Sequence, residues 1–103
     1  MPDCSIKGLI RMGVVPTGEV EDVLGNVAIL NFDGTVTLDD DNVGLSFTRS
    51  ARVHNMLVND VDRRVDPWRY WFVVIDGHRV PLGRLRMIVE YTLPLERIFE
   101  DGL

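Results

Sequence analysis

The sequence predicts a small, β-rich α+β domain, with a barrel-like portion or an antiparallel sheet, one helix near residues 50–64 and a C-terminal β-hairpin. Three observations support this prediction. Short β-branched runs separated by Gly and Pro are typical of strands. One segment has an apolar stripe at helical spacing, and one Asp-Gly pair stands between two apolar runs, which indicates a tight hairpin. With 103 residues, we expect a single domain over residues 1–103.

The first half of the chain is expected to consist of strands. Residues 6–15, "IKGLIRMGVV", form a short β-branched run that predicts a first strand. A second strand is expected at 27–32, and an Asp-Gly pair then leads into a return strand at 35–38. The acidic stretch 39–42 predicts a solvated loop.

The most helical segment is residues 50–64, "SARVHNMLVNDVDRR". Ser50 is the expected N-cap, and Asp66-Pro67 follows the predicted end, because the residue before proline avoids helical dihedral angles. The apolar residues at i, i+3, i+4 and i+8 form one stripe: Val53, Met56, Leu57 and Val61.

Two strands, 69–76 and 79–92, are predicted around a type I′ turn at Asp76-Gly77. This turn pairs Ile75 with His78, and it fixes which side chains share a face of the hairpin. The apolar face is expected to be core and consists of Trp71, Val73 and Ile75. A short helix is expected in the tail, within "TLPLERIFEDGL" at 92–103.

The second face of this hairpin has two interpretations, which the sequence leaves open. It presents an aromatic stripe around Tyr70 and Phe72, with Arg79 on the same face. Either the 50–64 helix covers this stripe, or the stripe binds a partner, because Tyr, Trp and Arg dominate interface energetics. The predicted partner-binding residues are Trp68, Arg69, Tyr70, Phe72 and Arg79.

Charge is distributed unevenly along the chain, whose net charge is −5. Residues 1–48 carry −6, residues 49–89 carry +4, and residues 90–103 carry −3. An acidic chain is not a general nucleic-acid binder, whereas opposite charges on one molecule favour self-association. The arginine-rich 49–89 region leaves an anionic ligand, such as nucleic acid or a nucleotide, as the alternative function.

No catalytic, metal-binding or cofactor motif is recognisable in the sequence. The "DDDNVG" stretch at 39–44 has Val43 where a calcium ligand is needed. Neither His54, which is expected on the polar face of the helix, nor the turn-flanking His78 has a metal-ligand neighbour at the required spacing. The single Cys4 excludes an internal disulfide and agrees with a reducing compartment. We therefore expect no enzyme activity, no metal and no cofactor.

Residues 15–39, "VPTGEVEDVLGNVAILNFDGTVTLD", resemble the opening of the small β-barrel chaperones that assist hydrogenase maturation. The shared features are a Pro-x-Gly-x-Val start, a Gly-x-x-Ala strand and an Asp-Gly turn, over about a quarter of the chain. The working cysteine of that family follows the initiator Met, whereas this chain has Pro2 there and its cysteine at Cys4. The resemblance implies a small barrel in the first half and does not extend to the activity.

Together these features predict a non-enzymatic protein-interaction module, such as a small adaptor, inhibitor or assembly factor that self-associates. Apolar runs are too short to span a bilayer, and the N-terminus lacks the pattern of a signal peptide. We therefore expect a cytoplasmic accessory protein with a protein partner, no membrane association and no nucleic acid.

Overall fold

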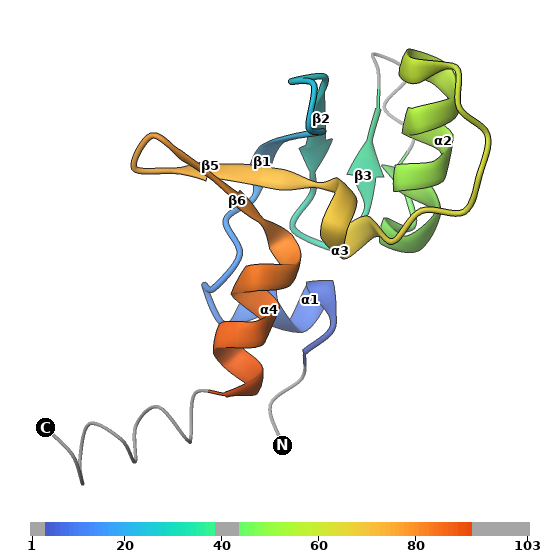
Figure 1. The fold of residues 1–103 in the computed structure, drawn as a ribbon. Helices are drawn as coiled ribbons and strands as arrows, with labels where there is room; N and C mark the ends of the chain where they lie inside the picture. The colour runs from blue at the N-terminus through green and yellow to red at the C-terminus, as the bar shows by residue number, and fades with distance from the viewer. Residues whose placement is uncertain (1–3, 39–43, 92–103) are drawn as a thin grey trace, which may run out of the picture.

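The computed structural model describes residues 4–38 and 44–91 and shows a small α+β domain (Figure 1). These residues form four helices and a six-stranded antiparallel sheet of order β4-β3-β2-β1-β5-β6. Along the chain the elements are α1 (Ile6–Arg11), β1 (Gly18–Glu21), β2 (Val27–Leu30), β3 (Val36–Thr37), β4 (Gly44–Leu45), α2 (Phe47–Asn59), α3 (Pro67–Tyr70), β5 (Phe72–Ile75), β6 (His78–Pro81) and α4 (Leu82–Glu90).

The hydrophobic core lies on one face of the sheet. Alternate strand residues point into it, as the period of two in a strand requires. The helices supply the other half: α4 buries three side chains there, and α1 and α2 contribute further ones. The fully or nearly fully buried apolar side chains include Leu9, Val20, Leu30, Val36, Ala51, Trp71, Val73 and Leu82.

The first strand predicted from the sequence, at 6–15, is wrong. Residues Ile6–Arg11 form α1, which begins at Ser5, whose hydroxyl accepts a hydrogen bond from the Gly8 amide at 3.1 Å. Ile6 and Leu9, three residues apart, are buried on one side of this helix. The cap and this spacing outweigh the β-branched composition of the segment.

The central helix is confirmed, but its ends and its buried face differ from the prediction. α2 begins after the N-cap Ser46 and ends at Asp60, whose left-handed backbone stops the helix before Asp66-Pro67. The predicted stripe is largely exposed at Met56 and Leu57. The buried face instead consists of Phe47, Ser50, Ala51, His54 and Asn55.

Polar side chains of α2 decide which face of the helix is buried, because they form hydrogen bonds inside the domain. The indole N–H of Trp71 donates to the hydroxyl of Ser50 at 3.0 Å. The prediction of Ser50 as the N-cap is therefore wrong, and so is the prediction of His54 on the polar face, because His54 is buried. A buried indole N–H needs an acceptor, and Ser50 provides it.

The register predicted around Asp76-Gly77 matches the observed pairing of β5 with β6. Ile75 lies opposite His78 and Val73 opposite Val80, and both turn residues have positive φ, as a type I′ turn requires. The predicted strands are too long at both outer ends. Residues 67–70 form α3, and Leu82 begins α4, so the strand predicted over 79–92 ends at Pro81.

The sheet is open, so the barrel-like arrangement is not confirmed. β4 and β6 are its two ends in the described residues, and Pro81 lies on such an end strand, where the missing amide is tolerated. The predicted acidic loop at 39–42 and the helix in 92–103 lie outside the described residues. Within the described ranges, no helix has the length and hydrophobicity that a bilayer crossing requires.

Candidate protein-binding surface

The second face of the sheet, here called the outer face, is left uncovered by the described helices. Val27, Ile29 and Val74 point outward from β2 and β5 with exposed fractions of 44%, 41% and 55%. Their neighbours along the strands, Ala28 and Val73, are buried. The outer face is therefore partly apolar and accessible to a partner.

Charged side chains lie between these apolar residues. Glu21 of β1 pairs with Val27 on one side and with Phe72 on the other, and Glu19 pairs with Ile29. Val74 lies opposite Arg79 of β6. Directly opposed residues share a face of a sheet, so both signs of charge and the apolar side chains lie on one surface.

Arg79 is held in place by three groups. Its Nε lies 2.7 Å from Glu21 Oε1, and its guanidinium also donates to the backbone carbonyl of Asp22. The same guanidinium lies over the Phe72 ring, 5.1 Å from the centroid. Of the predicted partner-binding residues, Phe72 and Arg79 thus lie together on the outer face.

Trp68 and Arg69 lie elsewhere, because residues 67–70 form α3 and not a strand. The Trp68 ring packs edge-on against Phe47, with 4.9 Å between ring centroids, and the Arg86 guanidinium lies 4.7 Å above its ring centroid. Arg69 is exposed on α3. The structure therefore does not bring the five predicted residues into one surface.

Tyr70 points inward and belongs to a buried polar cluster, so it does not extend the outer face. Its hydroxyl lies 2.6 Å from His54 Nδ1 and 3.4 Å from Asp22 Oδ2. The helix α2 therefore covers Tyr70, as one of the two interpretations proposed. The contact with Tyr70 is made by His54, whereas Leu57, which was expected to pack there, is exposed.

Asp22 is the acceptor at the centre of this cluster. Oδ1 accepts from the amides of Leu24 and Asn26 at 2.9 and 2.8 Å. Oδ2 accepts from the side-chain amides of Asn26 and Asn59 at 2.9 and 3.0 Å. Burial raises the pKa of the Asp22 carboxyl, but these hydrogen bonds outweigh it and the net pKa is lowered.

The same cluster changes the pKa of its other two titratable members. Burial lowers the pKa of His54 despite the opposing effects of the Asp22 charge and a hydrogen bond with the backbone of Val27. Burial raises the pKa of Tyr70, and the charge of Asp22 adds to this. The His54 imidazole thus joins α2 to Tyr70 and to the β1–β2 region.

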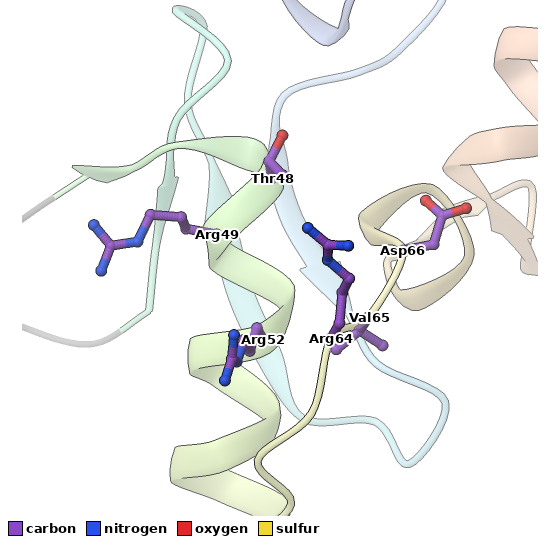
Figure 2. A pocket seen from close by; sticks show the side chains of 6 residues that line it. All are labelled: Thr48, Arg49, Arg52, Arg64, Val65 and Asp66. Carbon is purple, nitrogen blue, oxygen red and sulfur yellow. The ribbon is translucent and has the colours of Figure 1, made fainter.

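Two adjoining hollows lie along the segment that leads into α3: the first lies between this segment and α2, and the second lies on its side toward α3, Val23 and Phe72. The first, of about 630 Å³, is lined by Thr48, Arg49, Arg52, Arg64, Val65 and Asp66. Figure 2 shows Arg64 reaching toward the first turn of α2, while the carboxylate of Asp66 turns away from it. The second, of about 520 Å³, shares Arg64, Val65 and Asp66 with the first and adds Val23, Arg63, Arg69, Tyr70 and Phe72.

Sequence reasoning missed the contribution of β2 to the outer face. The segment was predicted to be a strand, but its outward residues Val27 and Ile29 could be recognised only once β1 was known to lie between β2 and β5. It also did not single out Arg49, Arg52 and Arg64, although the positive charge of residues 49–89 indicated their region.

Metal-ligating side chains do not gather in the described residues: no three of the His, Cys, Asp and Glu residues there are arranged to hold a metal ion. Cys4 is partly buried against the core. Comparison with protein-family models and with curated proteins finds no match for this chain.

Proposed function

We propose that this chain is a non-enzymatic protein-interaction module, an accessory protein that binds a second copy of itself through the outer face. The observation that carries this proposal is the set of three outward apolar side chains on β2 and β5, each between 41% and 55% exposed. These three side chains share one face of the sheet with the glutamates of β1 between them, and several exposed apolar side chains on one face indicate an interaction site more strongly than a single exposed one does.

A second copy is the favoured partner because the outer face carries complementary groups. In a two-fold dimer the same surface of each chain faces the other, so a self-complementary surface must carry both positive and negative groups. Glu19 is exposed and has no ion pair among the described residues, while Arg79, which pairs with Glu21 of its own chain, keeps a partly exposed side chain on the same face. A facing copy brings the arginine of one chain to the acid of the other and buries the apolar side chains between them.

The proposed place of action is the cytoplasm. A single cysteine in the sequence agrees with a reducing compartment. Fractionation of the native cells with an antibody to the chain tests this point, and recovery with the membrane or secreted fraction would contradict it.

Self-association is tested by light scattering coupled to size exclusion over a range of protein concentrations. We expect the wild-type mass to rise toward that of a dimer as concentration rises. The variant Val74→Glu places a charge at an exposed apolar position of the outer face and should remain monomeric. Met87→Glu, at a residue of α4 with a similar exposure of 56%, is the matched control and should dimerise like the wild type.

Two results would contradict the proposal. The first is a wild-type chain whose mass stays that of a monomer at every concentration, which would show that the chain does not self-associate. A dimer that survives Val74→Glu but dissociates with Met87→Glu uses the helical side of the domain and not the outer face.

A further inference from the structure

We propose that the two adjoining hollows, here called the arginine groove, bind an acidic peptide segment of a partner protein. This site is separate from the self-association surface and shares only Phe72 with the outer face. The described residues that line the groove include five arginines and one acid: Arg49, Arg52, Arg63, Arg64, Arg69 and Asp66. The groove is thus strongly basic on an acidic chain.

Most of these arginines are available to a ligand. Arg52 pairs with Asp62 at 3.0 Å, with both side chains more than half exposed. In residues 4–38 and 44–91, the other four arginines of the groove have no ion-pair partner. A guanidinium binds a carboxylate through two parallel hydrogen bonds, so unpaired arginines favour carboxylate ligands.

Three apolar side chains, here called the floor of the groove, also line it, and they favour a peptide over a bare anion. Val65 lies in both hollows, and Val23 and Phe72 line the second. A peptide with acidic and apolar side chains can satisfy the arginines and bury its apolar groups against this floor. An inorganic anion would use only the charges.

A nucleic-acid strand fits the same groove less well. Asp66 lines both hollows, and its negative charge would repel a backbone with a phosphate at every nucleotide, even though its carboxylate turns away from Arg64 (Figure 2). The chain as a whole carries −5, which repels a polyanion that extends beyond the groove. A peptide can leave a neutral residue opposite Asp66.

Fluorescence anisotropy with three labelled probes tests the proposal. The probes are an eight-residue peptide of alternating Glu and Leu, the same peptide with Gln in place of Glu, and an eight-nucleotide oligothymidine. We expect the acidic peptide to bind, the Gln peptide to bind at least about tenfold more weakly, and binding of the acidic peptide to weaken as salt screens the charges.

Variants then locate the binding site. Arg64 lines both hollows, so Arg64→Glu should weaken binding of the acidic peptide at least about tenfold. Arg84→Glu changes the net charge equally at an exposed site on α4 and should leave binding unchanged. Arg64→Gln removes the cation without adding an acid, and provides the same test if Arg64→Glu fails to fold.

Three results would overturn the proposal. The acidic peptide does not bind, Arg84→Glu weakens it as much as Arg64→Glu does, or oligothymidine binds more tightly than the peptide. The last result would assign the groove to nucleic acid. These peptide-binding results are independent of the test of dimerisation, because Arg64→Glu changes the arginine groove and Val74→Glu changes the outer face.

Discussion

The variant Asp22→Asn tests whether the buried cluster around Asp22 holds the domain together. The substitution keeps the shape of the side chain but replaces one oxygen with an NH₂ group. Asp22 is buried, and its two oxygens accept four hydrogen bonds of 2.8–3.0 Å from backbone and side-chain amides. An asparagine can accept only at one oxygen.

The expected loss follows from these contacts. In either orientation of the new amide, its NH₂ group faces two N–H donors that previously bonded a carboxylate. Each buried donor left without an acceptor costs about 1–3 kcal/mol, so we expect the free energy of unfolding to fall by about 3 kcal/mol. For a domain of this size, this corresponds to a decrease in Tm on the order of 15 °C.

Urea unfolding followed by tryptophan fluorescence measures this loss, because Trp71 lies beside the cluster. Asp62→Asn is the control. It breaks an exposed ion pair with Arg52 and should change the free energy of unfolding by no more than about 1 kcal/mol. If Asp22→Asn lowered the free energy of unfolding no more than this control does, the hydrogen bonds around Asp22 would not stabilise the domain, and the reasoning would be refuted.

Two further predictions concern the core. Because burial lowers the pKa of His54, the unfolded chain takes up a proton before the native chain does, so stability should fall as pH decreases below about 6.5. The urea midpoint of the wild type should decrease as pH decreases across this range, and the midpoint of His54→Gln should decrease less. An equal decrease in both proteins would show that a group other than His54 causes it. Val73→Ala removes two buried methyl groups and should cost about 2 kcal/mol, whereas the same change at exposed Val74 should cost less than about 0.5 kcal/mol in the same assay. Equal losses at the two positions would refute the assigned faces of β5.

The sequence by itself determined the features that depend on neighbours along the chain. An Asp-Gly pair between two β-branched runs specifies a tight hairpin turn, since both residues must take positive φ. The register that brings Val73 opposite Val80 follows from that turn alone. The positive charge of residues 49–89 likewise indicated the region of the arginine groove without its shape.

Only the tertiary structure decided which face of each element is buried. The apolar stripe of α2 looked like the core side, yet Leu57 is exposed, because Ser50 and His54 find partners in Trp71 and Tyr70. Such partners lie 16 to 21 residues away, beyond the reach of any periodicity. The outer face also depends on β1 lying between β2 and β5, an order that side-chain packing selects and local sequence does not encode.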